Sequence, residues 1–131
     1  MRLLLDTHVA LWTIIGDRRL PTRARELIEE DDNDVVVSVA SLWEISIKFG
    51  LGRKGPNAMP VSGPDALGYV REAGYELLDV KPDHAIAVQD LPPLHADPFD
   101  RLIVAQALVE PLRLITHDRL VASYSDAIIL V

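Results

Sequence analysis

Four acidic side chains stand where a carboxylate is costly unless a positive charge lies beside it. Asp6 directly follows the apolar run 2–5, and Asp100 opens a stretch that is apolar on nearly every side; Glu44 and Asp118 also follow apolar segments. Carboxylates that are held together repel one another and stay ionised only beside something positive. Oxygen ligands of this kind suit Mg²⁺ or Mn²⁺. A bound divalent cation lowers the pKa of a water molecule and so supports hydrolysis.

Most of these acids also have an ordinary structural alternative. Asp97 followed by Pro98 has the pattern of a helix N-cap with proline at the first helical position. Asp100, three residues on, fits the reciprocal position of a capping box, and Glu44 and Asp118 also match capping patterns. Each acid taken alone leaves both interpretations open. Taken together, four separate coincidences would have to converge on one site.

Asp6 is the acid for which capping offers the least explanation, because a carboxylate between an apolar strand and an apolar helix is expensive to bury without a partner. The four histidines show no HExxH-like spacing, so we expect oxygen atoms rather than imidazoles to bind the metal. Trp12 and Trp43 have apolar helical neighbours, and we expect both indoles to lie in the core.

Strand-like and helix-like segments alternate along the chain. The expected strands are 2–5, 35–38, 75–80, 112–116 and 127–131, and the expected helices are 7–15, 21–30, 39–49, 65–73, 82–89, 98–109 and 118–124. This order predicts an α/β fold with a parallel sheet that is covered by helices on both faces. Ligands of such sheets bind beyond the carboxyl ends of the strands. The four acids all fall at that edge.

Composition limits the class of protein. The chain has 131 residues, 49% hydrophobic and 25% charged, which predicts one globular domain. It contains no cysteine, so disulfides and thiolate chemistry are excluded. The formal net charge of −7 argues against a protein that binds nucleic acid over a broad basic surface. Asp6 and His8 interrupt the first apolar run, and no stretch is long enough to span a bilayer, so we expect a cytoplasmic protein without a membrane partner.

Four segments, LLLDTH, SLWEI, HADPFDRLIVAQA and LITHD, occur in an order that resembles the PIN-domain ribonucleases, most closely the VapC-type toxins of bacterial toxin–antitoxin pairs. The resemblance covers nearly the whole chain, and DPFDR and THD are its most specific parts. It implies a three-layer α/β/α sandwich with a central parallel sheet, formed by residues 1–131 as a single PIN domain.

The resemblance also implies an activity, namely Mg²⁺- or Mn²⁺-dependent endonucleolytic hydrolysis of RNA that leaves 5′-phosphate and 3′-hydroxyl ends. The family's four catalytic and metal-binding acids fall on Asp6, Glu44, Asp100 and Asp118. Asp6, Asp100 and Asp118 are expected to bind the metal directly, and Glu44 to bind it through water or to orient the nucleophile. Supporting roles beside these ligands are expected for Thr116, Ser38 and Asp97.

Basic side chains near the expected edge are candidates for gripping the RNA backbone. Lys48, Arg53 and Lys54 surround a Gly- and Pro-rich loop, and Arg101 and Arg119 lie near the acids. The loop trio has the alternative role of ordinary solubilising charge.

The family resemblance implies protein partners as well. A cognate VapB-type antitoxin is expected to hold such a toxin inactive, with the helices 7–15 and 39–49 as walls of its groove. A homodimer is also expected.

Other classes of protein share part of this pattern. A non-catalytic interaction module with a PIN fold is one alternative. A receiver-type phosphoacceptor domain would need adjacent acids after the first strand and a lysine after a late strand, and neither is present. A phosphotransferase with an aspartate nucleophile would need D-x-D, whereas Asp6 is followed by Thr7 and His8.

Overall fold

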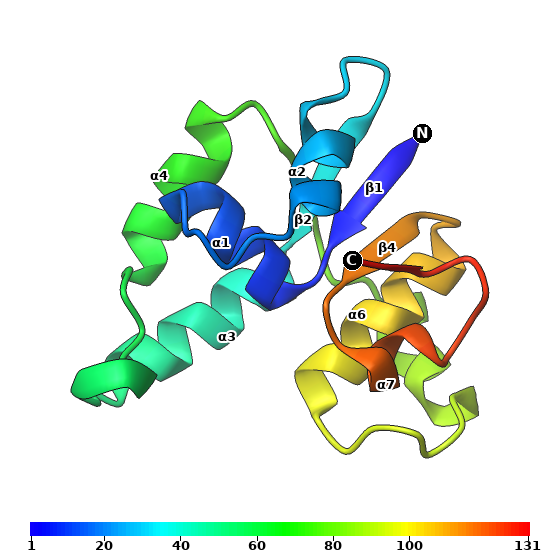
Figure 1. Cartoon of the computed structure of the whole chain (residues 1–131). Coiled ribbons are helices and arrows are strands. Elements are labelled where there is room, and N and C mark those ends of the chain that lie inside the picture. Colours follow the sequence, from blue (N-terminus) through cyan, green and yellow to red (C-terminus); the bar gives the residue numbers. More distant parts are fainter.

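A computed structural model describes residues 1–131 and contains one sheet of five strands in the order β3-β2-β1-β4-β5 (Figure 1). All neighbouring strands are parallel. The strands are β1 (Arg2–Leu5), β2 (Asp34–Ser38), β3 (Glu76–Leu78), β4 (Arg113–Thr116) and β5 (Ile129–Leu130). The α-helices are α1 (Thr7–Ile15), α2 (Thr22–Glu29), α3 (Val39–Gly50), α4 (Gly63–Glu72), α5 (Pro82–Ala87), α6 (Pro98–Val109) and α7 (Arg119–Ala122). Short 3-10 turns are η1 (Gly55–Asn57) and η2 (Val88–Asp90).

The central strands are apolar on both faces because helices cover both. Leu3 and Leu5 pack with α1, α2 and α4, whereas Leu4 between them packs with α6 and α7 on the other face. Successive strand side chains point to opposite faces, so an uninterrupted apolar run is what a doubly covered strand needs. The predicted three-layer α/β/α architecture is confirmed. No helix combines the length and the apolar character that crossing a membrane requires.

Element boundaries follow the sequence closely where a local stop signal exists. The helices predicted at 7–15 and 98–109 have those bounds, and Gly16 ends α1 with φ 65°, a left-handed conformation that glycine adopts at little cost. The last strand is shorter than predicted. Only Ile129 and Leu130 pair, with Ile115 and Thr116 of β4.

The two tryptophans differ in burial. Trp12 is 9% exposed, as predicted, but Trp43 is 57% exposed, so its predicted place in the core was wrong. On α3 the buried positions belong to other residues, including Glu44 and Ile45, and this leaves Trp43 on the outer side of the helix. Its indole instead packs edge-to-face on Phe99 of α6, with ring centroids 4.9 Å apart.

The strand register brings three helix beginnings to one edge of the sheet. Leu5 pairs with both Val37 and Ile115, so the residues that follow these strands lie side by side. The backbone N–H of Asp6 donates to the carbonyl of Ile115 at 3.0 Å, which extends the pairing one step past β1. Helices α1, α3 and α7 start within a few residues of this edge.

Candidate functional site

Asp6 lies at the carboxyl end of β1 and is held by both of its carboxylate oxygens. Oδ1 accepts the backbone N–H of Val9 at 2.9 Å, so Asp6 is the N-cap of α1. Oδ2 accepts the hydroxyl hydrogen of Thr116, whose oxygen in turn accepts the N–H of Asp118 at 3.0 Å. Burial raises the pKa of Asp6, against the opposing effect of these hydrogen bonds. The Thr116 hydroxyl therefore connects two of the predicted acids.

Asp100 and Asp118 meet at a histidine that the sequence analysis did not single out. The Nε2 atom of His95 lies 3.1 Å from Asp118 Oδ2 and 3.3 Å from Asp100 Oδ2. Nε2 of His95 and one carboxylate oxygen from each of Asp100 and Asp118 lie within 4.8 Å of one another. A lone histidine without a spaced partner has no recognisable sequence pattern, so its place between these acids could not be predicted.

The tautomer of His95 follows from its second nitrogen. Nδ1 accepts the backbone N–H of Asp97 at 3.0 Å, so the hydrogen of the neutral ring lies on Nε2 and points to the two carboxylates. Asp97 itself caps α6 by accepting the N–H groups of Phe99 and Asp100, at 2.8 and 3.1 Å. His95 thus donates a hydrogen bond to Asp118, with the Asp100 carboxylate 3.3 Å from the same nitrogen.

Asp100, like Asp6, has a raised pKa. Burial and the neighbouring carboxylates Asp97, Asp6 and Glu44 raise its pKa to about 7, with a smaller opposing effect of His95. Asp118 behaves differently. It is less buried, and although burial acts to raise its pKa, the hydrogen bond from His95 and those from backbone N–H groups lower it below its usual value.

Glu44 is the fourth acid and is only 3% exposed. Its Oε2 pairs with Lys48 Nζ at 2.6 Å, one helical turn along α3. Its Oε1 is buried and has no hydrogen-bond partner. A buried charged oxygen without a partner costs roughly 1–3 kcal/mol or more, so such atoms usually face a water or an ion.

These residues fit a divalent cation on three counts. The donor atoms are mainly carboxylate oxygens, which suit hard cations. Glu44 Oε1 is a buried acceptor that still needs a positive partner. Burial and, after it, the neighbouring carboxylates raise the pKa of Asp100, and a cation between the carboxylates would oppose that rise.

Arg101, predicted to contact substrate, uses its guanidinium to hold the loop before α6. It donates to the carbonyls of Val88, Leu91, Pro92 and His95, at distances from 3.0 to 3.5 Å. These bonds hold the loop that carries His95. Arg101 therefore orders the loop, and its contact with substrate stays a prediction.

Ser38 sits at the end of β2, where its hydroxyl caps α3 and donates to Gln106 Oε1 at 2.5 Å. Gln106 is fully buried on α6, and its amide donates to the carbonyl of Asp79 at 3.3 Å. Ser38 thus ties α6 to β2, and its predicted role beside the metal ligands stays a prediction.

The RNA contacts of three basic residues also stay predictions. Arg53 and Lys54 are exposed on the loop after α3, and Arg119 is exposed on α7.

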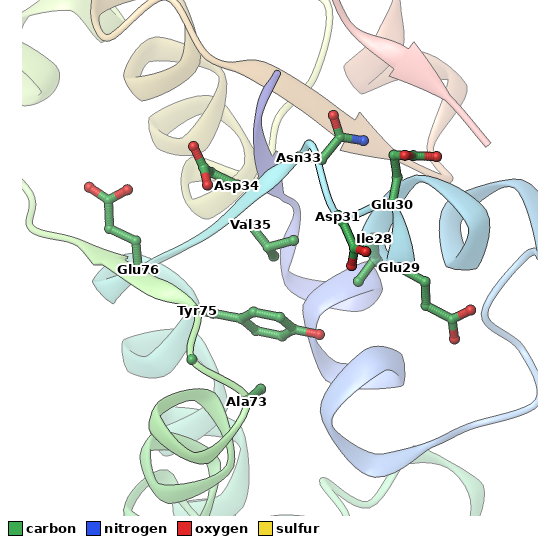
Figure 2. A pocket seen from close by; sticks show the side chains of 11 residues that line it. Ile28, Glu29, Glu30, Asp31, Asn33, Asp34, Val35, Ala73, Tyr75 and Glu76 are labelled. Atoms are coloured by element: carbon green, nitrogen blue, oxygen red, sulfur yellow. The ribbon is translucent and has the colours of Figure 1, made fainter.

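A second acidic cluster lies at the opposite end of the sheet, around Tyr75 (Figure 2). The acids beside it include Glu29, Asp31, Asp34 and Glu76, and Figure 2 shows their carboxylates pointing in different directions rather than toward a shared point. This arrangement is that of solvated surface acids. It contrasts with the convergence at the carboxyl edge.

Comparisons with known proteins match nearly the whole chain. A family model described as PIN domain matches residues 3–126. Ribonuclease VapC22 of Mycobacterium tuberculosis is 33% identical over 124 residues, which are 92% of this chain and 90% of that protein.

Solved structures show the same fold. VapBC2 from Rickettsia felis, bound to a promoter DNA fragment, matches with a TM-score of 0.66 and 17% identity over 100% of this chain and 98% of the other. DNA-bound VapBC from Salmonella typhimurium matches with a TM-score of 0.65 and 18% identity over 100% and 97%.

The raised pKa of Asp100 predicts how stability depends on pH without metal. The pKa is about 7 in the folded protein and 3.8 ordinarily, so between these values the folded state holds a proton that the unfolded chain has released. The contribution of Asp100 to stability is therefore greatest at low pH and is lost as the pH rises toward 7. Asp100→Asn should raise the melting temperature in EDTA at about pH 8, on the order of 5 °C.

Differential scanning calorimetry in EDTA at about pH 5 and pH 8 checks this, with Asp31→Asn at the far end of the sheet as the matched control. Equal melting temperatures of wild type and Asp100→Asn at the higher pH would contradict the strained state of Asp100.

Proposed function

This chain belongs to the PIN domain family, and from that premise we propose that it is a metal-dependent endoribonuclease acting as the toxin of a toxin–antitoxin pair. Its relative in Mycobacterium tuberculosis is named a ribonuclease, and a similar structure from Klebsiella pneumoniae is described as a toxin–antitoxin complex. The proposed substrate is RNA, cleaved in the cytoplasm.

The convergence of Asp6, Glu44, Asp100 and Asp118 is the observation that carries the proposal. Thr116 joins Asp6 to Asp118, and His95 joins Asp118 to Asp100. Asp6 and Glu44 both act on the charge of Asp100. Acids from four segments thus share one electrostatic environment, which a domain of purely structural role has no need to build.

The four acids divide between two proposed tasks. Asp6, Asp100 and Asp118 hold Mg²⁺ or Mn²⁺, which when bound lowers the pKa of water and stabilises charge on the phosphoryl oxygens. Glu44, whose Oε1 is buried without a hydrogen-bond partner, orients the attacking water, while Lys48 holds its other oxygen. Two neighbours hold these ligands in position: Thr116 donates a hydrogen bond to the Asp6 carboxylate, and Asp97 accepts the backbone N–H of Asp100.

A VapB-type antitoxin is the proposed partner, and the outer side of α3 supports this. Trp43, Ile47 and Leu51 follow one another at helical spacing and are 57%, 41% and 57% exposed. An apolar stripe of this kind fits the apolar side of a partner helix. A homodimer remains part of the proposal.

The acids are tested by single isosteric substitutions. Asp6→Asn or Asp100→Asn should abolish Mn²⁺-dependent cleavage of single-stranded RNA while the far-ultraviolet circular dichroism spectrum is unchanged. Asp31→Asn, which removes an acid at the other end of the sheet, should cleave like wild type. Sequencing of the 5′ ends of the fragments locates the cut. Full activity of both highly purified asparagine variants would reject the assignment.

Thr116 gives a second test, because its hydroxyl is the link between Asp6 and Asp118. Thr116→Val should lower kcat/KM for RNA by roughly 10–100-fold, the usual effect of removing a group that positions metal ligands. Thr116→Ser keeps the hydroxyl and should retain most of the activity. If the valine variant cleaves as well as the serine variant, Thr116 only fills space.

A further inference from the structure

Two cavities adjoin on the α1 side of the acids. One, of about 310 Å³, is lined by Asp6, His8, Trp12, His117 and Asp118. The other, of about 280 Å³, is lined by the segment 56–60, by cationic side chains and again by His8 and Trp12. The first turns of α1 therefore form a shared wall between them.

Aromatic rings line the first cavity beside the acids. The His8 and His117 rings lie 5.9 and 5.7 Å from the Trp12 ring, centroid to centroid. Trp12 is nearly buried, whereas both imidazoles are exposed. The Nδ1 of His117 is 2.7 Å from the carbonyl of Val131, which fixes the orientation of this exposed ring.

The second cavity is basic. Arg19, Lys48 and Arg53 line it, and Arg53 makes no ion pair. Arg19 is held in place by Asp17, which accepts hydrogen bonds from its Nε and Nη2 at 2.7 to 3.2 Å, while Nη1 makes none. The Arg19 side chain is 63% exposed, and its guanidinium lies 5.7 Å from the Trp12 ring centroid. A fixed, accessible guanidinium of this kind suits a phosphate.

We propose that the two cavities form one track for single-stranded RNA, an inference that rests on the proposed nuclease function. The nucleotide next to the cleaved bond places its base against His8 and His117 in the first cavity. The following backbone phosphate lies in the second cavity against Arg19 and Arg53. The track thus sets which nucleotide is presented to the acids.

The aromatic and basic side chains that line the two cavities favour RNA as the molecule bound there. Exposed aromatic rings stack on bases, and cations at the next position neutralise a phosphate, a combination typical of single-strand binding sites. The net charge of −7 makes the rest of the chain a poor polyanion binder, so local cations have to supply the attraction.

The basic half is tested by steady-state cleavage of a short single-stranded RNA with Mn²⁺. Arg19→Ala should raise KM roughly tenfold with little change in kcat and should flatten the salt dependence of KM, since one phosphate contact is lost. Arg18→Ala is the matched control, because Arg18 is an exposed neighbour that lines neither cavity, and it should behave like wild type. Equal KM values for the two variants overturn the basic half of the track.

The aromatic half is tested with RNA in which the nucleotide on either side of the cleaved bond is abasic. Wild type should lose about tenfold in kcat/KM when the stacked base is absent. His8→Ala should show a smaller abasic penalty than wild type, because only His117 is left to contact the base, and His8→Phe should restore the penalty. An abasic penalty as large in His8→Ala as in wild type overturns the inference, as does a wild type that shows no penalty at either position.

Failure of the track is distinguishable from failure of the nuclease assignment. A wild type that cleaves unmodified RNA, with variants that match it in every comparison, rejects the track alone. A wild type without Mn²⁺-dependent cleavage rejects both.

Discussion

Repulsion among carboxylates is the constraint around which this edge of the protein is built. Each acid has a positive or hydrogen-bonding counterpart: N–H groups and Thr116 for Asp6, Lys48 for Glu44, and His95 for Asp118. Asp100 accepts no hydrogen bond of this kind, and burial together with the neighbouring carboxylates raises its pKa to about 7. A divalent cation bound among these carboxylates would relieve their mutual repulsion. Its binding free energy would therefore be more favourable than at a site where the carboxylates are not crowded.

The fold supplies the positions that make this crowding possible. Parallel strands end at one edge, and the register of β1 with β2 and β4 brings their last residues side by side. The helices that follow begin there, so their free N–H groups face the acids and favour negative charge. Asp6, Asp97 and Asp118 are N-caps of their helices and also belong to the proposed site. Helix capping and proposed metal binding were alternative interpretations of these acids in the sequence, but in the structure one side chain can do both.

Much of this was predictable from the sequence. Apolar runs indicated the strands, Gly16 indicated the end of α1, and the Asp97–Pro98 pair indicated the start of α6. Ligands of parallel sheets bind beyond the carboxyl ends of the strands, and this rule predicted the edge where the acids meet. What remained hidden depends on contacts between distant segments. The direction of Arg101, the exposure of Trp43 and the place of His95 between two carboxylates are set by how α3, α6 and the preceding loop pack together, and no local pattern encodes that.

Side-chain ¹³C NMR of aspartate-labelled protein, titrated with and without Mg²⁺, tests the central claim most directly. Without the ion, one carboxyl resonance assigned to Asp100 should titrate near 7; with saturating Mg²⁺ its midpoint should fall by more than a pH unit. A midpoint near the ordinary value of 3.8 that Mg²⁺ leaves unchanged would show that the carboxylates are neither crowded nor shared by a cation.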